Sequence, residues 1–194
     1  MFERFRQPLE KVLEPIAKEL NIDPNLITIF SLIIAAIAAI FFALNDLILG
    51  GVLILLSGLL DVFDGAIARY HNKASKFGAF LDSTTDRFSD ALIIIGLIVG
   101  GYTNWVIGIL AIHSSITVSY VRAIAESKGI PCTIGIGERA SRLIILIAGA
   151  FIATQIGPMY MGIAILILVF VAYITVFQRI IHVWNWTKRA KTQE

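Results

Sequence analysis

Four aspartates lie between positions 61 and 86, in one of the most apolar regions of the chain: Asp61, Asp64, Asp82 and Asp86. One charged side chain near the middle of a membrane helix costs roughly 2.5 to 3.5 kcal/mol, so such a cluster indicates function or pairing. Unneutralised carboxylates would repel one another, and divalent cations remove that repulsion. Carboxylate oxygens suit hard ions such as Mg²⁺ or Mn²⁺, and four could hold two ions about 4 Å apart. We therefore expect a two-metal site able to polarise a phosphoryl group.

Helical spacing predicts two facing acidic stripes. Small and acidic residues recur every three or four positions in two segments, at Gly58, Asp61, Gly65 and Ala68, and at Gly78, Asp82 and Asp86. Two antiparallel helices would place these stripes opposite each other. The turn between them carries Arg69, Lys73 and Lys76, which could meet phosphate oxygens, although positive charge at a cytoplasmic helix end explains the two lysines equally well.

The composition predicts an all-α integral membrane protein. Hydrophobic residues make up 57% of the chain and charged residues 15%, and the mean hydropathy is +0.82. We expect one domain over 1–194, with a six-helix transmembrane core at 23–186. The expected spans are 26–44, 47–68, 77–99, 105–125, 140–153 and 159–183. The formal charge of +2 comes from cations at helix ends, which indicates a membrane-facing basic side and not a nucleic-acid partner.

The distribution of cations predicts the orientation. The connections 45–46, 100–104 and 154–158 contain no Lys or Arg, while every cation except Arg87 falls near the opposite ends of the spans. The positive-inside rule then places both termini and the acid cluster on the cytoplasmic side of the cell membrane. Residues 1–22 carry apolar residues at helical spacing among charges, which is typical of an amphipathic helix in the membrane interface, although a helix packed on a partner is the alternative.

The motif in this region resembles a known family signature. Its eight positions are Asp61, Asp64, Gly65, Ala68, Arg69, Gly78, Asp82 and Asp86, with the spacing of the CDP-alcohol phosphotransferase family. The resemblance implies six membrane helices, a homodimer, and transfer of a lipid phosphoryl group from a CDP-lipid to an alcohol with release of CMP. It also implies that Asp61, Asp64, Asp82 and Asp86 hold Mg²⁺ or Mn²⁺, and that Asp86 takes the proton from the attacking hydroxyl.

The resemblance also implies a set of residues that contact the CDP-lipid. They are Asn25, Thr28, Gly65, Arg69, Lys73, Ser75 and Gly78. Asn25 and Thr28 belong to a Pro-Asn-x-x-Thr pattern that family members carry at the start of the first span. Gly65 would leave space for the nucleotide, while helix capping explains Asn25 nearly as well.

Arginines outside the signature indicate which kind of alcohol accepts the lipid phosphate. Arg122, Arg139 and Arg179 lie at the cytoplasmic ends of three later spans, and Arg suits bidentate recognition of phosphate. Their segments resemble those of the phosphatidylinositol phosphate and archaetidylinositol phosphate synthase branch, which implies that they bind the phosphate of inositol phosphate. Glycerol 3-phosphate is the alternative acceptor, because it would engage the same arginines. A snorkelling position at a helix end is the structural alternative for each.

Three weaker features complete the prediction. Asp90 could contact hydroxyls of the acceptor or pair with Arg87, and we expect the pairing; we expect Arg142 to be a snorkelling residue. The glycine-rich connection 127–137 suits either a mobile lid or a plain connector. From a different functional class, the acids could line the conduction path of a cation channel or transporter.

Overall fold

The computed structural model describes residues 18–19 and 21–191, and from Pro24 onward this part of the chain forms six α-helices without strands. The helices are α2 (Pro24–Ala43), α3 (Leu47–Tyr70), α4 (Lys76–Val99), α5 (Trp105–Ser127), α6 (Arg139–Ile156) and α7 (Met159–Lys191). The amphipathic helix expected at 1–22 falls almost entirely outside the described residues. The all-helical prediction is confirmed.

Side-chain caps fix where four of the helices begin. The capping residues are Asp23, Asp46, Ser75 and Asn104, and each accepts a hydrogen bond from a backbone N–H in the first turn of its helix. The turns before α3 and α4 each contain an asparagine with positive φ, Asn45 at 65° and Asn72 at 54°. Asparagine tolerates this left-handed conformation better than most residues, so the chain reverses within a few residues at both turns.

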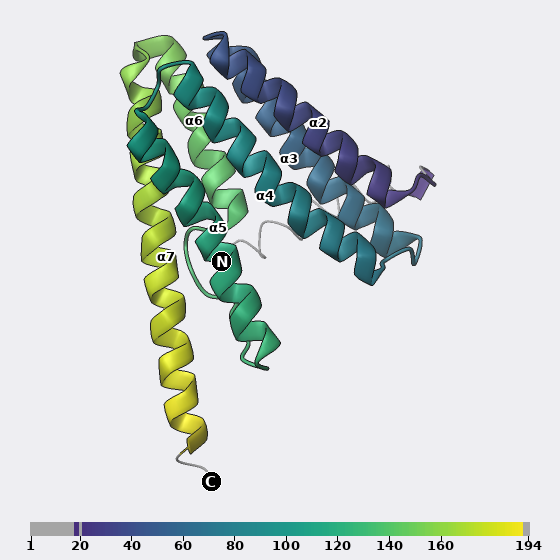
Figure 1. Ribbon diagram of the computed structural model, residues 1–194. Coiled ribbons are helices and arrows are strands. Elements are labelled where there is room, and N and C mark those ends of the chain that lie inside the picture. The colour runs from purple at the N-terminus through teal and green to yellow at the C-terminus, as the bar shows by residue number, and fades with distance from the viewer. Residues whose placement is uncertain (1–17, 20, 192–194) are drawn as a thin grey trace.

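The helices form two groups that lie side by side (Figure 1). α2 packs against α3 and α4, while α7 packs against α5 and α6, and contacts of α3 with α6 and of α4 with α5 join the groups. α2 and α4 approach closely at Gly96, where a methyl group would collide with the backbone of Ala39. Small residues at such a crossing allow two membrane helices to pack backbone to backbone. This packing fixes α4 and its acids against α2.

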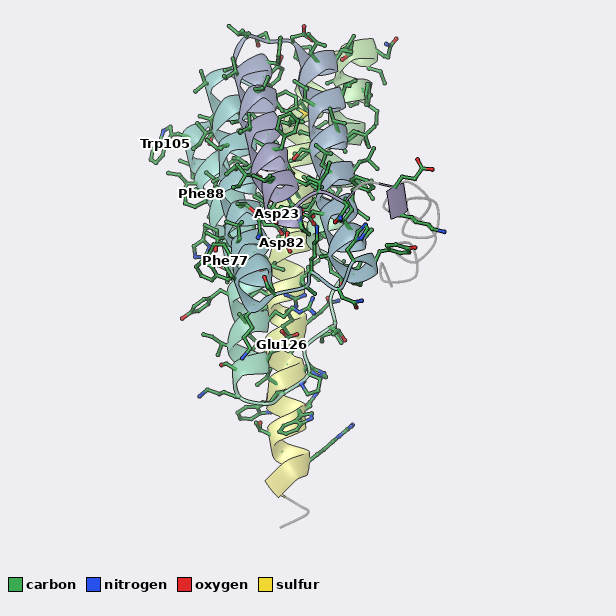
Figure 2. The ribbon with its side chains drawn as sticks, turned by 90° about the vertical axis from the view of Figure 1, so that its right-hand side faces the viewer. Asp23, Phe77, Asp82, Phe88, Trp105 and Glu126 are labelled. Atoms are coloured by element: carbon green, nitrogen blue, oxygen red, sulfur yellow. The ribbon has the colours of Figure 1, made fainter. Side chains whose placement is uncertain are left out.

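Five helices, α2, α3, α5, α6 and α7, are long and apolar enough to cross a membrane. α4 is not among them, since it carries Asp82, Asp86 and Asp90. Large apolar side chains are nevertheless exposed on its outer surface and on that of α5, including Phe77, Phe88 and Trp105, which project away from the bundle in Figure 2. The protein is therefore a multi-pass membrane protein, with its acids on the inner side of α4.

The helix ends agree with the expected spans within a few residues, except in α7. That helix has 33 residues, or about 50 Å at 1.5 Å per residue, against a hydrocarbon core of about 30 Å. It continues well past the expected end at residue 183. Figure 1 shows its C-terminal part extending beyond α2, α3 and α4.

The connection between α5 and α6 lies along this extended part of α7. His182 Nε2 is 2.9 Å from the carbonyl of Pro131, Arg179 Nε donates to the carbonyl of Ile134 at 2.9 Å, and the N–H of Gly137 donates to Thr175 Oγ1 at 2.7 Å. Three successive contacts favour a connector fixed to α7 over a mobile lid.

Candidate metal and substrate site

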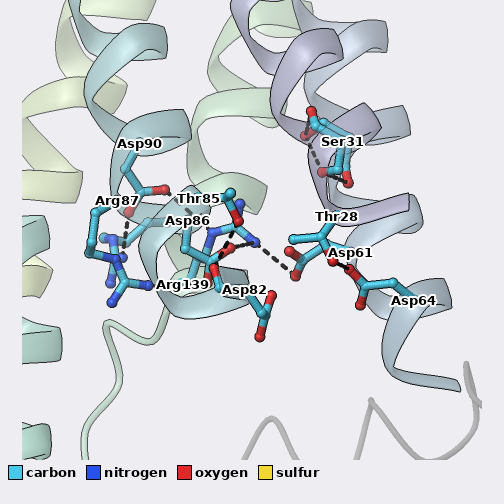
Figure 3. A network of polar contacts seen from close by, with 12 residues as sticks. Thr28, Ser31, Asp61, Asp64, Asp82, Thr85, Asp86, Arg87, Asp90 and Arg139 are labelled. Carbon is cyan, nitrogen blue, oxygen red and sulfur yellow. Dashed lines mark hydrogen bonds and ion pairs between the residues drawn. The ribbon is translucent and has the colours of Figure 1, made fainter. Parts of the chain in front are cut away.

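Aspartates of α3 and α4 gather at the end of the bundle near the α3–α4 turn (Figure 3). Asp61, Asp64 and Asp82 each offer one carboxylate oxygen, and these three atoms lie within 4.8 Å of one another. Asp64 is buried, with 5% of its surface exposed, while the other two are partly buried. Three oxygen donors at this separation fit a hard divalent cation. The predicted convergence of acids from two helices is present.

Asp86, the fourth predicted ligand, lies beside this group and has cationic partners. Its Oδ2 is 3.1 Å from Arg87 Nη2, and its Oδ1 is 2.8 Å from Arg139 Nη1. The side chain of Asp86 is 13% exposed, and its Oδ1 has no hydrogen bond of good geometry within the described residues. Asp86 is therefore held by ion pairs with two arginines at the edge of the acid cluster.

Arg139 brings a positive charge from α6 into the acid cluster. Its Nη1 lies 2.8 Å from Asp61 Oδ2 as well as 2.8 Å from Asp86 Oδ1, and its Nε lies 3.5 Å from Asp90 Oδ1. One guanidinium therefore joins acids of α3 and α4. The gathered carboxylates need positive charge, and this guanidinium supplies part of it at Asp61 and Asp86.

Thr28, which we expect to contact the nucleotide, also contacts a predicted metal ligand. Its hydroxyl donates to Asp64 Oδ2 at 2.5 Å, and Thr28 is only 4% exposed. A second acceptor for the same hydroxyl is the carbonyl of Pro24, at 3.1 Å. α2 thus supports the acid cluster from the side, and Figure 3 shows Thr28 between Asp61 and Asp64.

The other predicted CDP-lipid residues lie around the α3–α4 turn and the start of α2. A methyl group on Gly78 would lie 3.2 Å from Asn25 Oδ1 and 3.1 Å from Ser75 Oγ, so these three residues meet at the first turn of α4. Lys73 Nζ donates to Asn21 Oδ1 at 2.6 Å, which ties the turn to the segment before α2. Gly65 is half-buried on α3, and Arg69 is exposed in the last turn of that helix.

The three predicted acceptor arginines have different partners. Only Arg139 contacts the acids, while Arg122 Nε donates to Glu126 Oε1 at 2.8 Å on the exposed side of α5. Arg179 is 2% exposed and donates to the backbone carbonyls of Ile134 and Val118. Arg122 lies near enough to Arg179 to interact with it electrostatically. The structure therefore brings Arg139 into the acid cluster and uses Arg179 to join α5, α7 and the connection between α5 and α6.

Two predictions about charged residues were wrong. Asp90 pairs with Arg142 and not with Arg87, because Arg142 Nη2 lies 2.7 Å from Asp90 Oδ2 while Arg87 turns to Asp86. Arg142 does not snorkel: it is 2% exposed, and its Nη1 donates to the carbonyl of Gly137 at 2.8 Å. The spacing is compatible with this pairing but does not predict it: acids four residues apart on one helix can face arginines three residues apart on another once the two helices pack together.

Comparison with known proteins identifies the class to which this fold and this site belong. Residues 21–186 match the family model described as CDP-alcohol phosphatidyltransferase. The chain belongs to this family, and it is therefore a transferase of phospholipid biosynthesis, as its motif predicted. Family membership favours this activity over the cation channel that the acids alone would also allow.

Individual relatives are similar over nearly the whole chain. The archaetidylinositol phosphate synthase of Methanothermobacter thermautotrophicus is 44% identical over 97% of this chain and 96% of its own length. The crystal structure of Mycobacterium tuberculosis phosphatidylinositol phosphate synthase with CDP-DAG bound has a TM-score of 0.80 at 29% identity, covering 90% of this chain and 94% of that one. The same enzyme in complex with manganese and citrate gives 0.79 at 29% identity, over 89% and 88%.

Proposed function

We propose that this transferase moves a phosphatidyl-type lipid phosphate, diacyl or ether-linked, from a CDP-lipid to a hydroxyl of inositol phosphate and releases CMP. The observation that carries the proposal is the convergence of Asp61, Asp64 and Asp82 beside Asp86 and Arg139. The similarity to archaetidylinositol and phosphatidylinositol phosphate synthases supports inositol phosphate as the acceptor.

The acids have two roles in this proposal. Asp61, Asp64 and Asp82, with help from Asp86, hold Mg²⁺ or Mn²⁺, and the manganese complex of the mycobacterial enzyme supports this choice. Bound divalent ions would stabilise negative charge on the diphosphate. Asp86 takes the proton from the attacking hydroxyl, whose oxygen bonds to the lipid-linked phosphorus as the bond from that phosphorus to CMP breaks.

The donor binds between the α3–α4 turn and the start of α2. Arg69 and Lys73 supply positive charge to the diphosphate, while Gly65 and Gly78 leave room for the nucleotide. Asn25 and Ser75 meet beside Gly78, which places polar groups where the cytidine would enter. Thr28 acts on this site through Asp64, to which it donates a hydrogen bond.

The acceptor phosphate binds on the α6 side of the acids. Arg139 is the strongest candidate ligand, because its guanidinium already lies between the catalytic acids and α6. Arg122 and Arg179 complete the proposed cationic region from α5 and α7. Arg122 must leave Glu126 to take part, which exposed ion pairs do at little cost.

We place six spans in the membrane, namely α4 in addition to the five helices that are long and apolar enough to cross it. The chain forms a single domain over 1–194. Connections at the end of the bundle away from the acids, 45–46, 100–104 and 157–158, contain no Lys or Arg. We therefore place the active site and both termini in the cytoplasm. The interfacial helix at 1–22 and a homodimer are expected from the sequence and from the resemblance; mass measurement in detergent tests the dimer.

Release of CMP by the purified protein tests the proposed reaction. A CDP-lipid and Mg²⁺ are offered with inositol phosphate, glycerol 3-phosphate, inositol or serine in separate reactions. We expect turnover with inositol phosphate and none without an acceptor, and we expect Asp86→Asn to abolish it. Turnover with glycerol 3-phosphate alone would refute the acceptor assignment but leave the reaction type intact.

A further inference from the structure

Asp90 is a buried acid that neither the family signature nor the proposed reaction uses. It lies one helical turn beyond Asp86 in α4 and is 8% exposed. Both of its oxygens face guanidinium groups of α6: Oδ2 lies 2.7 Å from Arg142 Nη2, and Oδ1 lies 3.5 Å from Arg139 Nε. A carboxylate this deep in the bundle, held between two cations, has a specific role in placing them.

The guanidinium of Arg139 faces carboxylates on two edges, although its Nε makes no hydrogen bond within the described residues and meets Asp90 as an ion pair only. Its Nη1 points to Asp61 and Asp86, at 2.8 Å from each, whereas its Nε edge points to Asp90. Asp61 and Asp86 belong to the proposed metal and proton-transfer site. Among the described residues, Asp90 is the one carboxylate ion-paired with Arg139 that has no role in the proposed reaction. A buried arginine that loses its counterions is costly, so Arg139 needs Asp90 most when the other two acids are engaged.

We infer that Asp90 is a positioning residue for Arg139: its negative charge attracts the Nε edge of the guanidinium, so that the Nη groups are left to face the acceptor phosphate. The inference rests on the proposed function, in which Arg139 binds that phosphate. Arg142 in turn fixes Asp90, because one of its nitrogens pairs with Asp90 while Nη1 donates to the carbonyl of Gly137. The contacts therefore run from the carbonyl of Gly137 to Arg142, from Arg142 to Asp90, and from Asp90 to Arg139.

The direction in which Asp90→Asn changes acceptor binding distinguishes a positioning role from a simple effect of charge. Asp90→Asn removes a negative charge near an anionic acceptor, so charge alone would tighten acceptor binding. Positioning predicts the opposite, because Arg139 would lose the counterion on its Nε edge and its Nη groups would no longer be oriented toward the acceptor. We expect the KM for inositol phosphate to rise on the order of tenfold to a hundredfold, the usual range when the support of a binding group is removed.

The experiment compares Asp90→Asn, Asp90→Glu and Arg139→Ala in the purified full-length protein with Mg²⁺. It measures the KM for inositol phosphate, the KM for the CDP-lipid, and equilibrium binding of inositol phosphate by calorimetry. We expect Asp90→Asn to weaken acceptor binding and leave the donor KM unchanged, with partial recovery in Asp90→Glu. Asn keeps one oxygen for Arg142; if the variant still fails to fold, Asp90→Asn with Arg142→Gln removes both charges of the buried pair and should weaken acceptor binding equally.

Two results would overturn the inference, and they are distinguishable. If Asp90→Asn binds inositol phosphate as tightly as the parent or more tightly, while Arg139→Ala binds it weakly, Asp90 does not position Arg139 and the proposed function stands. If Arg139→Ala also binds inositol phosphate normally, the acceptor role of Arg139 fails, and the inference about Asp90 fails with it.

Discussion

Removing the hydroxyl of Thr28 is expected to weaken metal binding more than nucleotide binding. The hydroxyl lies 2.5 Å from Asp64 Oδ2, and both residues are buried, at 4% and 5% exposure. The hydroxyl orients Asp64, and removing a partner that orients a metal ligand typically costs about tenfold to a hundredfold in metal affinity. At about 1.4 kcal/mol per factor of ten, this loss corresponds to about 1.4 to 2.8 kcal/mol of binding free energy. We therefore expect Thr28→Val to raise the Mn²⁺ dissociation constant by an amount in this range.

The assay is titration of the purified protein with Mn²⁺, followed by electron paramagnetic resonance, together with CMP release at increasing Mg²⁺. Thr28→Ser is the matched control, because it keeps the hydroxyl and should bind metal nearly as the parent does. Thr28→Val replaces the hydroxyl by a methyl group of similar size, so packing changes little. An increase in the KM for CDP-lipid with unchanged Mn²⁺ binding would refute the reasoning and restore the nucleotide contact first predicted for Thr28.

Three other predictions concern residues that pack the helices and the α5–α6 connection around the site. Arg179→Ala should lower the unfolding temperature in detergent, because the guanidinium donates to two carbonyls that would lose their partner; an unchanged temperature would show that these contacts add nothing. Gly96→Ala should lower the unfolding temperature in detergent, because a methyl group at Gly96 collides with the backbone of Ala39. Burial raises the pKa of the Cys132 thiol, so maleimide should react slowly at pH 7.5 and faster as the pH rises; rapid labelling at pH 7.5 would show that the connection opens.

The helix crossing has its best matched comparison at Gly58 in α3. There, an added methyl group would lie 3.5 Å from Leu143, which is ordinary contact. Gly58→Ala should therefore change the unfolding temperature little, whereas Gly96→Ala should lower it clearly. Equal unfolding temperatures for the two variants would contradict the close packing of α2 on α4.

Much of the fold follows from the sequence because apolar runs and helix caps are local signals. Asp23 followed by Pro24 predicts the start of α2, and the structure begins the helix there. The end of α7 was harder to predict, since residues beyond the span still favour a helix but no longer have to cross the hydrocarbon. The contacts of α7 with the α5–α6 connection, through Arg179 and His182, lie before the expected end of the span.

The acids of the site could also be predicted, because their spacing places them on one face of each helix. The partners of the arginines could not. Arg139 and Arg142 open α6, far in sequence from Asp86 and Asp90, and only the packing of α6 in the bundle shows which acid each arginine meets. Local pairing of Asp90 with Arg87 was the simpler expectation, and it was wrong because the buried Arg142 is the closer partner.

The contact of Thr28 shows the same limit. A motif at the start of a helix indicates that its polar residues matter, but it does not show which atom each one meets. The hydroxyl of Thr28 reaches Asp64 only because α2 packs directly on α3. A role inferred from the motif alone therefore has to be tested against tertiary contacts.

The central claim is that aspartates of α3 and α4 together hold divalent ions. Anomalous diffraction from crystals grown with Mn²⁺ tests it most directly. We expect a manganese peak bounded by the carboxylates of Asp61, Asp64 and Asp82, and loss of that peak in Asp64→Asn. A fully occupied manganese site elsewhere in the bundle, with no peak between these three carboxylates, would contradict it.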